Sequence, residues 1–168
     1  MMKKTLFLVG LCLSLSACGF TPMYGTKFQD SNIVDIRSEL ANIEIANISN
    51  YEGQYLRNAL MDRFYTNARP MESRYVLRIA AIQERITNLD ITINSNATRA
   101  QLHLNTKMSL TDKQSGEVVL ERNLSSTSGY NILTSEFATR VSEKNMRKNT
   151  LNDLAHQIET QIGLYLKR

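Results

Sequence analysis

The sequence predicts an α+β fold, a two-layer sandwich in which two helices cover one face of a mostly antiparallel sheet of about four strands. Several stretches alternate apolar and polar residues, which is the pattern of half-buried strands. Two others carry apolar residues three and four positions apart, which is the pattern of helices packed on one side. In chain order these stretches read β-α-β-β-β-α. With only two helices available, the second face of the sheet is expected to stay uncovered.

The first two elements are a strand over residues 40–48 and a helix that begins after Ser49. Glu52 follows Ser49 at the three-residue spacing of a capping box, in which side chains satisfy the free N–H groups at a helix start. Asn67 and Pro70 are expected to end this helix. Its apolar stripe consists of Leu56, Leu60 and Phe64.

Three strands are predicted next. Residues 75–82 are apolar on both faces, which favours a central strand, whereas residues 87–96 are rich in Asn, Thr and Ser and fit either a twisted strand end or a loop. Residues 99–110 form a long strand with a polar outer face, and residues 112–116 form the turn into a return strand over residues 117–128. The inward residues of the long strand are Ala100, Leu102, Leu104, Met108 and Leu110.

The last predicted element is a long helix. Thr134 or Ser135 caps it, and Glu136 lies in its first turn, where the helix dipole favours a carboxylate. A charged gap over residues 144–149 interrupts its apolar stripe and indicates either a break or a poorly covered turn. The stripe consists of Phe137, Val141, Leu151, Leu154, Ile158 and Ile162.

The N-terminus ahead of this domain, which we place at residues 39–168, has the arrangement of a bacterial lipoprotein signal. Two lysines precede an apolar run that ends at Leu15-Ser16-Ala17-Cys18. Residues 1–17 are therefore predicted to be a signal peptide, and Cys18 the site of lipid attachment at the head of a tether over residues 18–38. The apolar run is about half the roughly 20 residues that a membrane-spanning helix needs. Several acyl chains, palmitate among them, would anchor the protein stably.

The residue after Cys18 bears on the destination of the protein. This residue is Gly19 and not an aspartate. By resemblance to enterobacterial lipoproteins, this favours the outer membrane over retention at the inner membrane.

Composition excludes several functional classes. Cys12 lies in the predicted signal peptide and Cys18 carries lipid, so no thiol remains for a disulfide, a metal site or a nucleophile. Two lysines leave with the signal, which lowers the formal net charge from +4 to +2. No dense basic run occurs, so a nucleic-acid partner is not predicted.

Enzyme chemistry is not predicted either. His103 lies on the polar face of the long strand and His156 on the last helix, and neither has a metal-ligand partner at a suitable spacing. No nucleophile elbow or phosphate-cradling glycine loop occurs. We therefore expect no catalytic residue, no metal and no cofactor.

Three basic residues form the candidate ligand site. Arg99 and Lys107 fall on one face of the long strand, and Arg122 is expected to face them from the return strand. Arg and Lys bind phosphate, so these residues predict a weak site for an anionic glycolipid. The alternative is a solvated face with scattered charges.

The start of the predicted mature chain resembles that of the LptE family of lipopolysaccharide-assembly lipoproteins, in its alphaproteobacterial form. The run from Cys18 reads Cys-Gly-Phe-Thr-Pro-Met-Tyr-Gly, where the family typically has Cys-Gly-Phe, a variable residue and Pro-Leu-Tyr-Gly. Met23 thus stands where leucine is usual. The element order and the C-terminal helix, with Phe137-Ala138 and Leu154-Ala155, are also similar to the family.

This resemblance implies a protein without enzymatic activity. Members of the family sit in the lumen of a large outer-membrane β-barrel, LptD, help that barrel assemble and assist delivery of lipopolysaccharide to the cell surface. Such lumens are polar and can be plugged by another element, which suits a sheet with an uncovered polar face. The alternative hypothesis is a freestanding periplasmic lipoprotein that binds an amphiphile or a cell-wall component.

Overall fold

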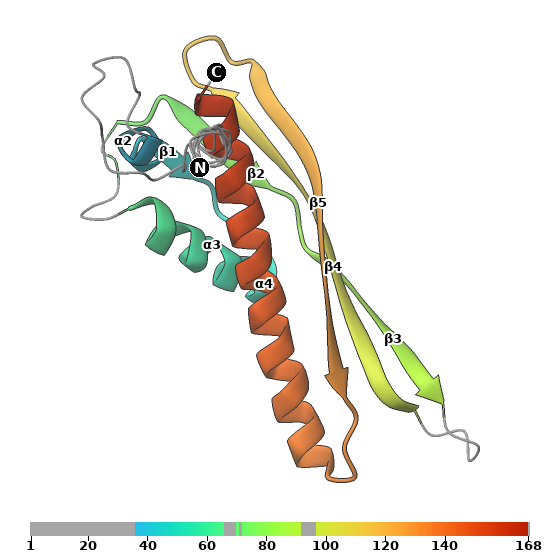
Figure 1. Ribbon diagram of the computed structural model, residues 1–168. Helices are drawn as coiled ribbons and strands as arrows, with labels where there is room; N and C mark the ends of the chain where they lie inside the picture. Colours follow the sequence, from blue (N-terminus) through green and yellow to red (C-terminus); the bar gives the residue numbers. More distant parts are fainter. Residues whose placement is uncertain (1–35, 66–69, 71, 92–96, 168) are drawn as a thin grey trace, which may run out of the picture. The chain divides into compact units, whose positions relative to one another are not determined.

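The computed structural model describes residues 36–65, 70, 72–91 and 97–167, all of which belong to the compact unit Val34–Arg168. The α+β class that the sequence predicts is confirmed. The described part holds five strands and three helices, one strand and one helix more than predicted (Figure 1). In chain order the elements are α2 (Ile36–Ala41), β1 (Ile43–Ile45), α3 (Asn50–Phe64), β2 (Tyr75–Ile79), β3 (Gln83–Ile91), β4 (Ala97–Asp112), β5 (Val118–Asn131) and α4 (Glu136–Leu166).

Strand β4 is the centre of the sheet. On one side it pairs antiparallel with β3 along its first half and with β2 along its second half, and on the other side it pairs antiparallel with β5. Strand β1 adds to β2 in parallel, so the sheet is mixed. Because β2 and β3 follow one another along the same side of β4, the sheet is long and narrow toward the β3 end (Figure 1).

The alternation predicted for the long strand is confirmed. The even-numbered residues of β4 from Ala100 to Asp112 are buried, and the odd-numbered residues are exposed or half-buried. The helices lie on the buried face, where α4 follows β5 along its length (Figure 1). The apolar residues predicted to pack these helices on the sheet are buried: Leu56, Leu60, Phe64, Leu151, Leu154, Ile158 and Ile162.

The first strand is shorter than predicted, because part of residues 40–48 is helical. Ile36 and Leu40 of α2 are four residues apart and both are buried, so they form the apolar side of a short helix. Only Ile43–Ile45 pairs with β2. Helix α2 therefore overlaps the end of the span predicted as a tether. Residues 1–35, with the predicted signal peptide and Cys18, lie outside the described residues.

The additional strand is β3, in the stretch that the sequence left open between a strand end and a loop. Residues 80–82 separate it from β2, and Thr106 Oγ1 donates to the carbonyl of Ala80 there at 2.8 Å. The described side chains of β3 are largely exposed. Polar residues such as Asn and Thr are tolerated in such a strand because little of it must be buried.

Helix α3 begins where the capping spacing predicted, but a different side chain caps it. Ser49 stands at the N-cap without a side-chain hydrogen bond. Instead the N–H of Gly53 donates to Oδ1 of Asn50 at 2.9 Å, and Asn50 has a φ of +67°. Asn adopts this left-handed conformation more readily than most residues, which explains its position here.

Helix α4 runs without interruption from Glu136 to Leu166, so the charged gap is not a break. Its predicted cap is confirmed, because Ser135 Oγ accepts from the N–H of Ala138 at 3.4 Å. The assignment of Phe137 and Val141 to the core is wrong: their side chains are 79% and 42% exposed.

Candidate functional site

The face of the sheet opposite the helices, which carries the odd-numbered residues of β4, is here called the open face. No helix of the described part of the chain covers it (Figure 1). His103 Nδ1 lies 3.0 Å from Thr127 Oγ1, and Lys107 Nζ lies 2.9 Å from Glu121 Oε1. The residues of β4 on this face are Arg99, Gln101, His103, Asn105, Lys107, Ser109 and Thr111. Polar side chains therefore line the open face along the whole of β4.

The structure does not bring the three predicted basic residues together. Arg99 and Lys107 lie on the open face, but eight residues apart, which is roughly 27 Å along a strand. Arg122 pairs with Met108 of the buried face, and directly opposed residues point to the same side of a sheet. Arg122 is therefore on the helix side, and the prediction that it faces Arg99 and Lys107 is wrong.

A one-residue irregularity in the pairing of β4 with β5 explains why the prediction for Arg122 is wrong. The pairing of β4 with β5 shifts by one residue between Leu110 and Thr111. Without this bulge, the register that starts at Thr111 and Val118 would place Arg122 opposite Lys107. A shift of one residue moves every following side chain to the other face.

Lys107 lines a polar depression of the open face at the point where β2 ends and β3 begins. This depression has a volume of about 450 Å³. Amide and hydroxyl groups from three strands surround the lysine: Gln83, Asn105, Asn123 and Ser125. Such groups offer hydrogen bonds to a polar ligand, and Lys107 adds a positive charge that Glu121 partly balances.

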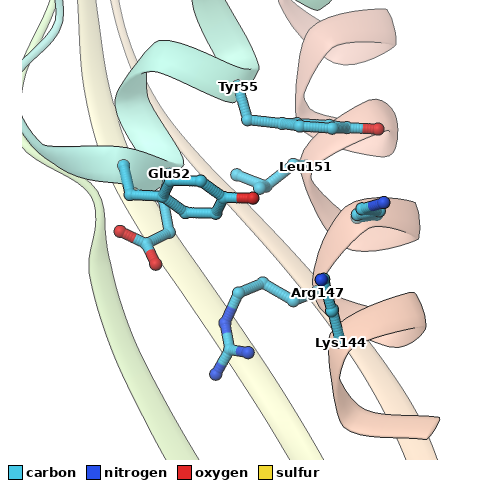
Figure 2. Close-up of a pocket in the computed structure, with 7 residues that line it drawn as sticks. Glu52, Tyr55, Lys144, Arg147 and Leu151 are labelled. Carbon is cyan, nitrogen blue, oxygen red and sulfur yellow. The ribbon is translucent and has the colours of Figure 1, made fainter. Parts of the chain in front are cut away.

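A second hollow, a cleft of about 370 Å³, lies between α3 and α4 (Figure 2). Sequence reasoning missed it because its α4 wall falls in the charged gap. Asn152 Nδ2 donates to the hydroxyl of Tyr55 at 3.4 Å and ties the two helices together there. The lining residues are Tyr51, Glu52 and Tyr55 of α3, and Lys144, Arg147, Lys148 and Leu151 of α4.

Arg147 anchors the wall of this cleft to the sheet. Its guanidinium forms two hydrogen bonds to Glu84 of β3, at 2.6 and 2.9 Å, and a third to Glu143 at 2.8 Å. These carboxylates raise the pKa of Arg147 above its ordinary value, with the bonds to Glu84 as the largest cause. Within the described part of the chain, Lys144 and Lys148 form no such pair, and they line the cleft together with Glu52 of α3.

A separate cluster of charges closes the other end of the sheet, at the β4–β5 turn. Lys113 pairs with Glu44 of β1 and lowers the pKa of that carboxyl. The N–H of Gln114 donates to Asp112 at 2.8 Å and, with the guanidinium of Arg74, lowers the pKa of Asp112 below its usual 3.8. These bonds join β1, β2 and the turn, and we assign them a structural role.

The described residues contain no group of His, Cys, Asp or Glu that could hold a metal ion. None of the helices in this part of the chain is both long enough and apolar enough to cross a membrane. His156 of α4 has an exposed side chain that lies 3.6 Å from the buried Glu159, and His103 is part of the open face.

The fold defines the class of the protein: an α+β sandwich with helices on one face of a mixed sheet and an open, polar second face. The chain belongs to the LptE family, described as lipopolysaccharide-assembly, whose model matches residues 40–162. An uncharacterized protein of Rickettsia prowazekii (strain Madrid E) is 24% identical over 165 residues, which cover 97% of this chain and 98% of that protein.

Several solved structures share the fold. A candidate lipoprotein from Caulobacter crescentus has a TM-score of 0.61 and 17% identity, with 78% of this chain and 95% of that one covered. Rare lipoprotein B from Shewanella oneidensis has a TM-score of 0.57 and 12% identity, with 75% and 98% covered.

Proposed function

We propose that this protein is a lipid-anchored outer-membrane lipoprotein that occupies the lumen of an LptD-type β-barrel, helps the barrel assemble and assists delivery of lipopolysaccharide to the cell surface. The observation that carries the proposal is the match to the lipopolysaccharide-assembly family over residues 40–162. The names of the solved neighbours, which are lipoproteins, agree with it.

The open face supports a position inside a barrel. A soluble domain usually buries one face of its sheet and presents the other to water, and the lumen of a large barrel is a polar, hydrated environment. The open face presents hydroxyl, amide and charged groups over the length of β4, which suits contact with the polar inner wall of a barrel.

Co-purification tests the barrel partnership. The tagged full-length protein is extracted from outer membranes in mild detergent and its partners are identified by mass spectrometry. A stable one-to-one complex with a β-barrel protein of the LptD type is expected. A protein that elutes without a partner and binds an amphiphile would favour the freestanding lipoprotein instead.

Lipidation at Cys18 is tested separately. The wild-type protein is expected to incorporate labelled palmitate in a bacterial host and to fractionate with outer membranes. The Cys18→Ser variant is expected to lose the label. Label retained by this variant would show that the anchor is elsewhere.

Contact with lipopolysaccharide is proposed at Arg99 and at Lys107 as two separate points, because their spacing prevents both from holding one phosphate. The Arg99→Ala and Lys107→Ala double variant is expected to bind lipopolysaccharide more weakly than wild type. Arg122→Ala, on the other face, is the matched control and should bind normally. Unchanged binding by the double variant would remove both residues from the proposal.

A further inference from the structure

One line of side chains runs along the whole of α4 at alternating spacings of four and three residues. This spacing keeps the side chains on one side of the helix and is the spacing with which helices interdigitate. We call this line the α4 seam. Its members are Phe137, Val141, Lys144, Lys148, Leu151, Ala155, Ile158 and Ile162.

The two halves of the α4 seam differ in burial. From Leu151 to Ile162 all four members are buried in the core that α4 forms with α2, α3 and the sheet. From Phe137 to Lys148 all four are exposed or half-buried, because α3 begins at the level of the cleft and does not extend further along α4 (Figures 1 and 2). We call the buried part, Leu151 to Ile162, the occupied half of the seam, and the exposed part, Phe137 to Lys148, its vacant half.

Apolar groups gather around the vacant half. Phe137 is 79% exposed, and Tyr51, which closes the vacant half at the cleft, is 65% exposed. Ile86 follows Glu84, the partner of Arg147, by two residues on β3, and it is 42% exposed although it pairs with Leu102 of the buried face. Single exposed apolar residues are ordinary, but several on one surface mark an interaction site.

The two charged members of the seam in the vacant half, Lys144 and Lys148, are both basic, and Glu52 of α3 lines the same cleft. Arg140 pairs with Glu136 at 2.6 Å and Arg147 with two carboxylates. Lys144 and Lys148, which belong to the seam, form no ion pair with any described residue. A surface that combines apolar groups with two such lysines complements a partner with apolar and acidic side chains.

We propose that the vacant half of the α4 seam, Phe137 to Lys148, docks an amphipathic, acidic segment of the barrel protein. This proposal rests on the proposed function. The segment continues the layer that α2 and α3 form on the occupied half, with apolar side chains against Phe137 and Val141 and carboxylates against Lys144 and Lys148. A protein segment fits better than an acyl chain, because the spacing of the seam matches regular secondary structure and the occupied half already receives helices.

Photo-crosslinking tests the position of the partner. The full-length protein carries p-benzoylphenylalanine in place of Phe137 or, in a second variant, of Val141, and is irradiated in outer membranes. The control position is Val118, which is 56% exposed at the far end of β5. We expect an adduct with the co-purifying barrel protein from positions 137 and 141 and none from position 118.

Each other outcome overturns a defined statement. A complex that co-purifies without adducts at 137 and 141 refutes the docking proposal and leaves the proposed function intact. Adducts with lipopolysaccharide or with a second copy of this chain refute the choice of a barrel segment. A wild-type protein without any barrel partner overturns the proposed function and this proposal together.

Charge reversal provides the second test. Lys148→Glu and Arg122→Glu make the same change in charge at exposed positions, and Arg122 donates to the carbonyl of its neighbour Glu121. We expect Lys148→Glu to retain about one-tenth of the barrel protein that wild type retains, and Arg122→Glu to retain the wild-type amount. Equal retention by both variants would refute the role of Lys148, provided that both unfold at the wild-type temperature.

Discussion

Gly53→Ala is expected to destabilise the protein, although alanine is the better helix former. Gly53 is buried in the first turn of α3. A Cβ at this position would lie 2.6 Å from Cγ2 of Ile48 and 3.1 Å from Oδ1 of Asn50. Ile48 is itself almost fully buried, so it has little room to move.

One stabilising and two destabilising effects set the change in the free energy of unfolding. Alanine in place of glycine favours a helix by about 1 kcal/mol. Overpacking a buried contact costs about 1–3 kcal/mol. Moving the Asn50 amide away from the N–H of Gly53 costs about 1 kcal/mol more, because it removes the cap. We therefore expect the free energy of unfolding to fall by about 1–3 kcal/mol.

Urea unfolding followed by circular dichroism measures this change, with the m-value required to stay constant. Gly129→Ala is the control, because a Cβ there would meet its nearest neighbour, the Ala100 carbonyl, at 3.7 Å. The control is expected to stay within about 0.5 kcal/mol of wild type. If Gly53→Ala stabilised the protein by about 1 kcal/mol, the close approach to Ile48 would be refuted.

Three further changes test the charged and capping contacts. Asn50→Ala should lower the free energy of unfolding by about 2 kcal/mol, because it removes the cap and forces alanine into the left-handed region. Asn50→Gly also removes the cap but tolerates this backbone conformation, so it should cost only a few tenths of a kcal/mol. Urea unfolding of both variants separates the two causes. Folding lowers the pKa of Asp112, so its contribution to stability is complete above its unfolded pKa near 3.8 and is lost as the pH falls below that value. Asp112→Asn should therefore be less stable at pH 7 and lose less stability on acidification than wild type, as urea midpoints between pH 7 and 3 will show. Arg147→Ala leaves Glu84 and Glu143 without their shared cation and should lower the free energy of unfolding at pH 7 by about 1–3 kcal/mol, as thermal unfolding will show.

The sequence predicted the elements whose burial is one-sided. β4 alternates cleanly because its even-numbered side chains pack on helices while its odd-numbered ones face outward. β3 escaped this reasoning because it buries few side chains, so its sequence carries no strong alternation. The capping residue was misassigned by one position, since the spacing of Ser49 and Glu52 does not reveal that Asn50 takes a positive φ.

The candidate site was harder to predict because it depends on register. Placing Arg122 opposite Lys107 requires an unbroken ladder, and the bulge after Leu110 moves Arg122 to the other face. No turn residue in the sequence signals this bulge. The cleft is equally hard to predict from sequence, because it depends on where α3 begins against α4 rather than on any motif.

A last prediction concerns Phe137, which the sequence wrongly assigned to the core. Helical periodicity shows that a side chain lies on the apolar side of a helix, but not whether that side packs within the same chain or against a partner. Phe137 belongs to the same seam as Ile158, yet it is 79% exposed and Ile158 is fully buried. Ile158→Ala should lower the free energy of unfolding of the isolated protein by about 2–5 kcal/mol, because it leaves a cavity. Phe137→Ala should change it by less than about 0.5 kcal/mol. Urea unfolding of the isolated protein compares the two. A cost for Phe137→Ala near that of Ile158→Ala would mean that Phe137 packs inside the domain, and the seam would then have no vacant half.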